Sequence, residues 1–222
     1  MNLLLYYITD RAQFPGDASH QRRLLLQTVA EAARCGVDYI QLREKDLSPR
    51  ELEQLAGQAI REIRKLVSVR GGEVSTALLV NSRSDVALSV GADGVHLRAD
   101  DISPVQAREI FSTHVRSARP EARAWVVGVS CHSAADVAAA AAASADFAVF
   151  APVFEKKGGF STHPAGLSAL REACRQSIPV MALGGVTLEN ARACVEAGAA
   201  GIAGIRLFQE HDIAETVRVL RG

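Results

Sequence analysis

The sequence predicts a single (β/α)8 barrel, the TIM-barrel fold, as one domain over residues 1–222. Short apolar strands alternate with helical segments eight times along the chain. Such alternation implies parallel strands joined by right-handed crossovers, and eight units fit a compact barrel of this length. A doubly wound open sheet is the main alternative, but no Gly-x-Gly-x-x-Gly motif follows the first strand. Similar phrases at Gly91–Val95 and Gly198–Ile202, with a weaker echo at Cys35–Ile40, indicate one reused module.

The strands are expected where apolar residues form short runs between turns and helices. In the second of them, Ile40 and Leu42 alternate with Gln41 and Arg43, which is the period of a strand. In chain order, the expected strands span Leu3–Ile8, Val37–Leu42, Ala77–Val80, Asp93–Leu97, Ala124–Val129, Asp146–Ala151, Ile178–Leu183 and Gly201–Ile205.

The helices are expected from apolar spacing, capping residues and terminal glycines. Ser48, with Pro49 at the first helical position and Glu51 at the third, fits a capping box, and Gly36 ends the preceding helix. A polar surface loop is expected through Arg116 and Pro120. The expected helices span His20–Cys35, 48–69, Ser84–Val90, 103–111, Ser133–Ala143, Leu167–Arg175, Thr187–Ala197 with Thr187 as its cap, and Asp212–Leu220.

Composition and charge exclude several classes of function. The chain has 25 basic and 25 acidic residues, so its overall charge supports neither nucleic-acid binding nor membrane-surface binding. No apolar run reaches the ~18 residues of a membrane span, and the N-terminus does not resemble a signal peptide. The four cysteines form no Cys-x-x-Cys pair, so reduced thiols in the cytoplasm are expected. The sequence leaves open whether the chain forms a homo-oligomer.

Polar residues recur where the predicted strands end, which in a barrel is the functional face. Strand two contributes two cations, strand seven ends in two glycines, and an acidic pair follows strand four. Taken in chain order, the candidates are Gln41, Arg43, Lys45, Asn81, Ser82, His96, Asp100, Asp101, Ser130, His132, Lys156, Lys157, Gly184, Gly185, Ile205 and Arg206.

This set favours a small phosphorylated substrate. Arginine and lysine bind phosphate oxygens through charge-assisted hydrogen bonds. A glycine pair exposes backbone N–H groups and, with the turn after strand eight, makes a phosphate cradle. An aspartate beside a polyphosphate is a reasonable Mg²⁺ ligand. Structural alternatives stay open: a surface ion pair Arg43–Glu44, a tight turn at Gly184-Gly185, an acidic helix start at Asp100-Asp101, a packed His96 and a helix-capping His132.

The chain resembles the thiamine phosphate synthase family and its relatives, the TenI-like thiazole tautomerases. The resemblance covers nearly the whole chain. It rests on the ordered motifs Tyr6-Tyr7-Ile8-Thr9-Asp10, Gln41-Leu42-Arg43-Glu44-Lys45, Asn81-Ser82-Arg83-Ser84-Asp85-Val86-Ala87, Gly91-Ala92-Asp93-Gly94-Val95-His96-Leu97, Gly128-Val129-Ser130, Pro152-Val153-Phe154 and Ala182-Leu183-Gly184-Gly185-Val186. It implies a (β/α)8 barrel that joins hydroxymethylpyrimidine diphosphate to thiazole phosphate and releases diphosphate with magnesium.

The resemblance also implies residue roles. Gln41 would contact the pyrimidine, and Ser130 would assist at the reacting centre. The diphosphate would be held by Arg43, Lys45 and Asn81, and Mg²⁺ by Asp101. The thiazole phosphate would lie against Gly184-Gly185 and the backbone near Ile205-Arg206. Departure of diphosphate leaves a pyrimidine-stabilised cation, so catalysis is mainly leaving-group stabilisation and placement of the thiazole nitrogen, without a covalent nucleophile.

Three departures from the synthase pattern leave the activity open. Ser82 stands where an aspartate usually provides a second magnesium ligand, and Arg98-Ala99 replaces the usual Gly-Gln. The usual Pro-Thr-x-Thr-Lys loop is replaced by 155–159, so Lys156 or Lys157 would have to take over its role. The hypotheses are a synthase with an altered diphosphate grip, a tautomerase that moves protons with His132, and a non-catalytic binder of thiazole or thiamine phosphate.

Overall fold

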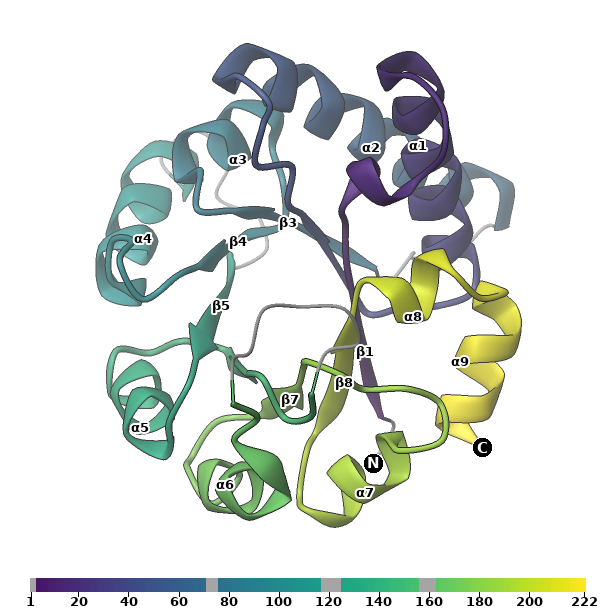
Figure 1. Ribbon diagram of the computed structural model, residues 1–222. Coiled ribbons are helices and arrows are strands. Elements are labelled where there is room, and N and C mark those ends of the chain that lie inside the picture. Colours follow the sequence, from purple (N-terminus) through teal and green to yellow (C-terminus); the bar gives the residue numbers. More distant parts are fainter. Residues whose placement is uncertain (1–2, 71–75, 117–124, 156–162) are drawn as a thin grey trace.

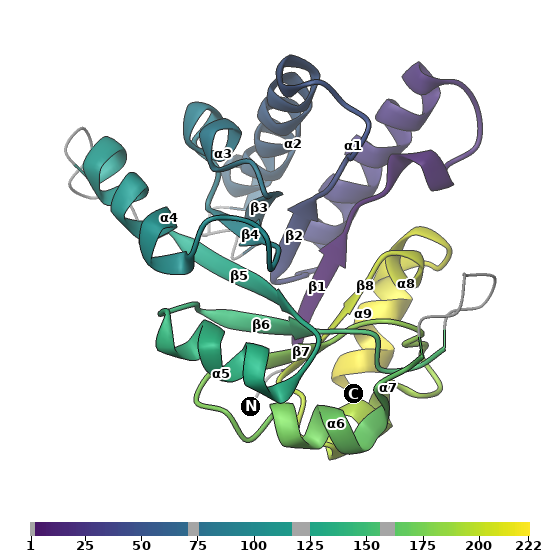
Figure 2. The same cartoon turned by 60° about the vertical axis from the view of Figure 1, so that its left-hand side comes forward.

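Eight parallel strands close into a barrel in the computed structural model, in the order β1-β2-β3-β4-β5-β6-β7-β8, with helices around the outside (Figures 1 and 2). This confirms the predicted fold. The structure describes residues 3–70, 76–116, 125–155 and 163–222. The strands are β1 Leu4–Ile8, β2 Tyr39–Leu42, β3 Ala77–Asn81, β4 Gly94–Leu97, β5 Val126–Cys131, β6 Phe147–Phe150, β7 Val180–Ala182 and β8 Gly201–Gly204.

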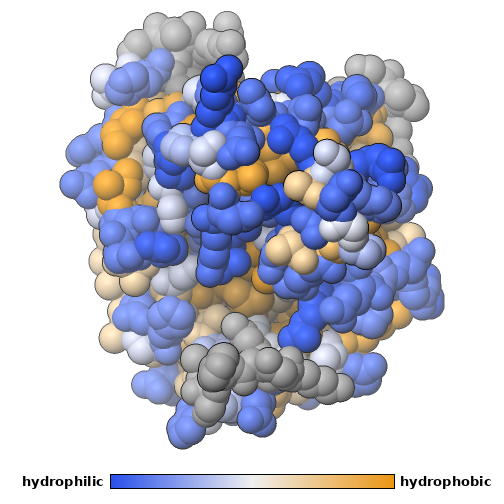
Figure 3. Space-filling view, turned by 45° about the horizontal axis from the view of Figure 1, so that its top comes forward, coloured by the Kyte–Doolittle hydropathy of each residue, from blue (hydrophilic) through white to orange (hydrophobic). Residues whose placement is uncertain are grey.

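The connecting segments contain α-helices and two short helices of other types. The α-helices are α1 Ala18–Arg34, α2 Pro49–Arg70, α3 Ser84–Val90, α4 Pro104–Phe111, α5 Ala134–Ala142, α6 Gly166–Ala173, α7 Ala191–Glu196, α8 Arg206–Gln209 and α9 Ile213–Arg221. A 3-10 helix, η1, covers Arg11–Gln13, and a π-helix, η2, covers Ser112–Arg116. No helix of the described residues is long and apolar enough to cross a membrane. One face of the molecule is covered mostly by hydrophilic residues (Figure 3).

The boundaries differ from the sequence prediction at identifiable points. Strand β2 starts at Tyr39 instead of Val37, because the Val37 N–H closes helix α1 on the Ala32 carbonyl at 3.0 Å. Helix α7 starts at Ala191, so the expected cap at Thr187 is wrong; its N–H bonds Asn190 Oδ1 at 2.8 Å in a preceding turn. Helices η1 and α8 were not predicted because they are too short to show periodicity. Part of the expected loop before residue 117 is helical, as η2.

Two separate apolar cores result from the alternation of each strand. Residues on the inner face fill the barrel: Tyr6, Ile8, Leu79, Phe147, Val149, Met181 and Ala203. Residues on the outer face, such as Leu5, Ile40 and Val80, pack against the helices in a second, larger cluster. Burial of these residues provides the main favourable contribution to folding. The prediction of one domain over residues 1–222 stays a prediction.

The repeated glycine phrase has a steric explanation. Gly94 and Gly201 begin β4 and β8, and each lies against the backbone of a neighbouring strand. A Cβ atom at Gly94 would lie 2.0 Å from the Val126 carbonyl oxygen, and one at Gly201 would lie 2.5 Å from that of Leu4. Only glycine therefore allows this close approach of the strands.

Aspartates that directly precede three of the strands form hydrogen bonds at the base of the barrel. Asp38, Asp93 and Asp146 each come directly before an even-numbered strand. Their Oδ2 atoms accept the N–H groups of Leu5 at 2.7 Å, Leu78 at 2.8 Å and Val127 at 2.6 Å, all on the preceding strand. At the fourth equivalent position stands Ala200, which has no such acceptor. The recurrent carboxylate thus fixes the register of three strand pairs.

Asp146→Ala should lower the free energy of unfolding by about 1–3 kcal/mol, because the strand N–H of Val127 loses its side-chain acceptor and the Arg108 guanidinium loses one of its three acceptors. Asp146→Asn retains an oxygen acceptor and should lose less. Urea unfolding followed by circular dichroism measures both. Equal losses in the two variants would show that charge, and not the strand-end hydrogen bond, determines the effect.

Candidate active site

The polar residues of strands two to five lie on the inner face of the barrel. Their neighbours Leu42, Val80 and Leu97 belong to the outer core, so Gln41, Asn81, His96 and Ser130, one position away, face inward. Strand register places Asn81 beside His96. The structure therefore brings these four side chains to the same face of the barrel.

A chain of hydrogen bonds crosses the barrel at this level. Gln41 Nε2 donates to Tyr6 Oη at 2.9 Å. Tyr6 Oη lies 3.1 Å from His96 Nδ1, and His96 Nε2 lies 2.8 Å from Ser130 Oγ. Tyr6, Gln41 and His96 are buried, whereas Ser130 is partly exposed. Tyr6 was not among the predicted site residues, because a tyrosine within the run Leu3–Ile8 gives no sign of which face it occupies.

Aromatic rings hold His96 in place. The ring of Tyr6 packs edge-on against Phe147 at a centroid distance of 5.3 Å, and Phe147 also contacts Tyr39 and His96. A Cβ atom at Gly128 would lie 2.4 Å from the Phe147 ring and 2.9 Å from His96 Nδ1, so this packing requires glycine. Burial lowers the pKa of His96 to about 3, and the nearby positive charge of Arg43 adds to the lowering. His96 is therefore neutral at physiological pH.

Arg43 is a half-buried cation that directly follows β2, two residues after Gln41. Within the described residues its guanidinium makes no hydrogen bond or ion pair, and burial lowers its pKa. The open possibility of a surface pair with Glu44 is contradicted, because Glu44 is buried and pairs instead with Arg11 at 3.1 Å. Asp10 and Glu44 act on the Arg43 charge through space, but no described carboxylate forms an ion pair with it, which suits an anionic ligand.

Thr9 and Arg11 fix the backbone on which Arg43 stands. Thr9 Oγ1 accepts the Arg43 N–H at 3.0 Å and donates to Glu44 at 2.5 Å. Arg11 bonds Glu44 and also forks onto Asp46 at 2.6 and 2.7 Å. Glu44, which lies between Arg43 and Lys45 in the sequence, is thus turned away from the barrel axis and held there by these hydrogen bonds. Distance along the chain, 33 residues from Arg11 to Glu44, conceals this pairing in the sequence.

The other predicted cations are distributed differently. Lys45 is exposed on the segment after β2 and has an interaction of its own. Arg206 is exposed at the first residue of α8. Lys156 and Lys157 lie outside the described residues. Arg98, which was noted only as a departure from a motif, is close enough to Arg43 for its charge to lower the pKa of that guanidinium.

The loops after β3 and β4 contain the candidate metal ligands. Ser82 has a left-handed φ of +60°, and its hydroxyl accepts from Asn81 Nδ2 at 3.0 Å. Asp101 Oδ2 accepts the Arg98 N–H at 2.7 Å, and Asp100 pairs with the Arg98 guanidinium. Ser103 caps helix α4, as expected, and the acidic pair lies ahead of this cap. Among the described residues, no group of three or more His, Cys, Asp or Glu side chains could hold a metal.

His132 has one defined tautomer in its neutral form. Its Nδ1 lies 2.7 Å from the Ala151 carbonyl oxygen, which can only accept, so Nδ1 carries the proton. Nε2 then keeps its lone pair. Ser133, and not His132, caps helix α5 with its side chain. A histidine held in this way can accept a proton at Nε2.

The glycine pair after β7 is part of a packed junction. Gly184 and Gly185 have φ values of +96° and +64°. A Cβ atom at Gly184 would lie 2.7 Å from Pro152, and one at Gly185 would lie 2.5 Å from the Glu155 carbonyl. Their N–H groups donate to no other group of the described chain. Beside them in the barrel order, Ile205 lies against the inner core and accepts two N–H groups of α8.

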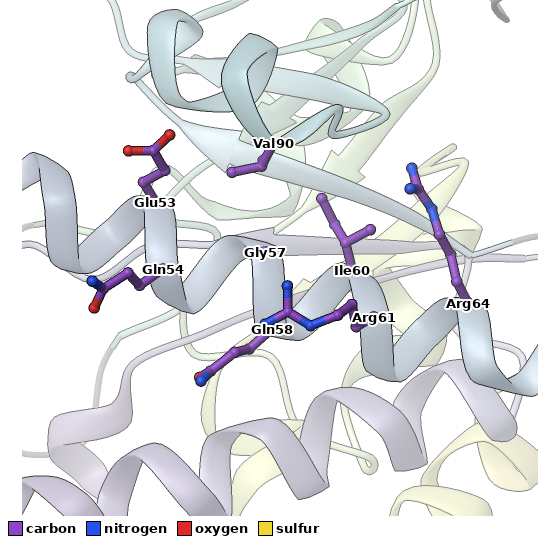
Figure 4. Close-up of a pocket in the computed structure, with 8 residues that line it drawn as sticks. All are labelled: Glu53, Gln54, Gly57, Gln58, Ile60, Arg61, Arg64 and Val90. Carbon is purple, nitrogen blue, oxygen red and sulfur yellow. The ribbon is translucent and has the colours of Figure 1, made fainter.

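A separate groove of about 480 Å³ lies outside the barrel, between helices α2 and α3 (Figure 4). It is lined by side chains that include Glu53, Arg61 and Arg64 of α2 and Val90 of α3. None of the predicted site residues takes part in it.

Comparison with known proteins gives a consistent family. Residues 5–208 match the family described as thiamine monophosphate synthase. The chain is 37% identical to the thiamine-phosphate synthase of Methanoculleus marisnigri, with coverage of 98% of this chain and 93% of that protein. It is 33% identical to the thiamine-phosphate synthase of Syntrophomonas wolfei, with coverage of 98% and 94%. The solved thiamine phosphate pyrophosphorylase of Pyrococcus furiosus superposes with a TM-score of 0.75 at 29% identity, covering 99% of this chain and 94% of that one.

The buried His96 should make stability depend on pH. Its pKa is about 3 in the folded chain and about 6.5 when unfolded, so acid protonates the unfolded form first. His96 stabilises the fold fully above pH 6.5, and this contribution should fall by about 2 kcal/mol at pH 5. Urea unfolding of the wild type and of His96→Gln between pH 7 and 5 measures the difference. A parallel pH profile of the two proteins would contradict the assignment.

Proposed function

The chain belongs to the thiamine monophosphate synthase family, and we propose that it is a thiamine-phosphate synthase. It condenses hydroxymethylpyrimidine diphosphate with thiazole phosphate to give thiamine phosphate and diphosphate. The bond between the pyrimidine methylene carbon and the diphosphate oxygen breaks, and a bond from that carbon to the thiazole nitrogen forms. The electron pair of the broken bond leaves with diphosphate.

Arg43 is the observation that carries this proposal. Diphosphate gains negative charge as it leaves, and a preorganised cation that is already partly desolvated stabilises this charge more than a hydrated one does. Arg43 is half-buried and stands on a backbone fixed by Thr9, and its guanidinium makes no hydrogen bond or ion pair with a described residue. Lys45 and Asn81 would complete the grip on the leaving group.

The two organic rings would lie on opposite sides of this cation. Gln41 and Ser130 lie at the inner wall of β2 and β5 and would contact the pyrimidine. The N–H groups of Gly184 and Gly185, which donate to no other described residue, would bind the thiazole phosphate together with the backbone at Ile205-Arg206. Holding both substrates in this arrangement removes much of the entropic cost of their encounter.

A magnesium ion fits this site only if the substrate provides most of its ligands. Asp101 has a carboxylate at the mouth, one oxygen of which already accepts the Arg98 N–H. Ser82 offers a hydroxyl, which is a weak ligand compared with a carboxylate. When bound, Mg²⁺ would neutralise the charge of the diphosphate. Asp101 would hold it, and Arg43 would share the neutralisation.

A second candidate, thiazole tautomerisation, is favoured by His132. Its fixed Nδ1–H tautomer leaves Nε2 able to accept and return a proton at a carbon or nitrogen of the thiazole. Tautomer interconversion without diphosphate release would support this activity. Binding of both phosphorylated compounds without either reaction would indicate a non-catalytic binder.

We also place the protein in the cytoplasm, acting on small phosphorylated molecules and not on nucleic acid. All four cysteines are free, and burial raises the pKa of the Cys131 thiol to about 12 and that of Cys194 to about 11. Free thiols suit a reducing compartment. Analytical ultracentrifugation in the presence of Mg²⁺ and substrate would establish whether the chain forms a homo-oligomer.

Diphosphate release with both substrates and Mg²⁺ tests the function directly. Arg43→Ala should lower kcat by about 10²–10³-fold, because the departing charge loses a preorganised donor. Arg43→Lys should retain part of the activity because it keeps a positive charge. Arg192→Ala is the matched control, since Arg192 is exposed on α7 and pairs only with Glu196 within the described chain. Unchanged turnover in Arg43→Ala would refute the role of this residue.

The metal assignment has its own test. Asp101→Ala should raise the Mg²⁺ concentration for half-maximal activity, since it removes the only carboxylate assigned to the ion. Ser82→Asp should lower that concentration, and the left-handed φ of +60° at this position is one that aspartate tolerates. Magnesium titration of initial rates measures both. An unchanged requirement in Asp101→Ala would show that the ion binds elsewhere.

A further inference from the structure

We propose that Tyr6 is a positioning residue. Its hydroxyl donates to Nδ1 of His96, and His96 therefore donates from Nε2 to Ser130. Ser130 is then left to donate its own proton to the substrate. The identity of the substrate rests on the proposed function, whereas the direction of the hydrogen bonds does not. The four residues come from adjacent parts of the barrel wall, Gln41 from β2, Tyr6 from β1, His96 from β4 and Ser130 from β5.

The direction of the chain follows from the hydroxyl of Tyr6. This hydroxyl is fully buried and has two partners within the described residues, Gln41 Nε2 at 2.9 Å and His96 Nδ1 at 3.1 Å. An amide nitrogen can only donate, so Tyr6 accepts from Gln41. If Tyr6 also accepted from His96, its own proton would have no acceptor in a buried site, at a cost of about 1–3 kcal/mol. Tyr6 therefore donates to Nδ1.

The tautomer of His96 follows in turn. Burial lowers the pKa of His96 to about 3, so the ring is neutral and carries a single N–H. With Nδ1 accepting from Tyr6, this N–H is at Nε2, which lies 2.8 Å from Ser130 Oγ. Ser130 Oγ accepts from it and keeps its own proton for another partner.

Packing holds this arrangement rigidly. Phe147 lies against both Tyr6 and His96, and the absence of a side chain at Gly128 leaves the room that their rings occupy. Tyr6 and His96 therefore have no space to exchange partners. Because Ser130 is the one partly exposed member, the chain of donors ends at the substrate side of the barrel.

The consequence is a selection of substrate chemistry. A ligand atom that takes the Ser130 proton must be a hydrogen-bond acceptor, such as a ring nitrogen with a lone pair or a phosphate oxygen. A ligand with only donor atoms at this point would leave that proton without an acceptor in a partly desolvated site. His96 and Tyr6 move no proton in the reaction; they set which way Ser130 points its own.

Long-range ¹H–¹⁵N NMR of the imidazole tests the direction without any substrate. In the wild type, His96 should show a protonated Nε2 and an unprotonated Nδ1, with its signals identified by their loss in His96→Gln. Tyr6→Phe removes the partner of Nδ1 and should shift these signals toward a mixture of tautomers. Tyr7→Phe is the matched control: it is the neighbouring residue, and its buried hydroxyl has no partner within the described residues. This control should leave the His96 signals unchanged.

A protonated Nδ1 in the wild type would overturn the proposal. It would mean that the Gln41 amide is reversed, so that Tyr6 donates to Gln41 and His96 accepts from Ser130. Signals of Tyr6→Phe identical to those of the wild type would also overturn it. Neither result would bear on the thiamine-phosphate synthase assignment, because no substrate is present.

Turnover provides the second arm. Tyr6→Phe should lower kcat for diphosphate release about tenfold, as expected for the loss of one well-placed hydrogen bond, and leave the KM for thiazole phosphate unchanged. Tyr7→Phe should keep the wild-type kcat. Equal losses in the two variants would assign the effect of Tyr6→Phe to general destabilisation and contradict the positioning role. If the wild type releases no diphosphate, the proposed function fails while the NMR result still decides the direction of the chain.

Discussion

The alternation of side chains in a closed parallel barrel is the constraint on which this site depends. Because each strand sends every second residue inward, polar residues at the same height on neighbouring strands must meet at the barrel axis. Gln41, His96 and Ser130 are brought together in this way from three strands that are far apart in the chain. A shift of one residue in any strand would place its polar residue in the outer core, where it would have no partner.

The same constraint explains why a buried ion pair lies beside the site. The sequence Arg43-Glu44-Lys45 places three charges in succession, and alternation directs the middle one away from the other two. Glu44 is then buried, with 1% of its side chain exposed. Burial of this charge would cost free energy without the ion pair to Arg11 and the hydrogen bond from Thr9. Burial on its own raises the pKa of Glu44, and these hydrogen bonds oppose that shift. The pair directs the Glu44 carboxylate to Arg11 and keeps it from forming an ion pair with Arg43.

Much of this architecture could be predicted from the sequence, for physical reasons. The strands were found because their apolar runs are short and bounded by glycines and caps. Period two set Gln41 apart from Ile40 and Leu42, and Asn81 was proposed because it follows the third strand. Tyr6 was missed because its neighbours are all apolar or aromatic, so no contrast marks its face. The partner of Glu44 was misjudged because a contact between distant segments has no local signal. The short helix α8 was missed because four residues complete only one turn.

The carboxylates at the base of the barrel group the strands into pairs. Asp38, Asp93 and Asp146 each tie one strand to the strand before it, so a piece made of two strands carries its own closing bond. The last piece, with Ala200, lacks the carboxylate bond, and its carbonyl accepts the Leu4 N–H of the first strand at 3.1 Å, as the carbonyls of Asp38 and Asp93 accept N–H groups of their following strands. At this position the fourth pair, β7 and β8, keeps only the backbone bond from the Ala200 N–H to the Val180 carbonyl at 2.8 Å, so a carboxylate holds the register in three of the four pairs and the backbone alone holds it in the fourth.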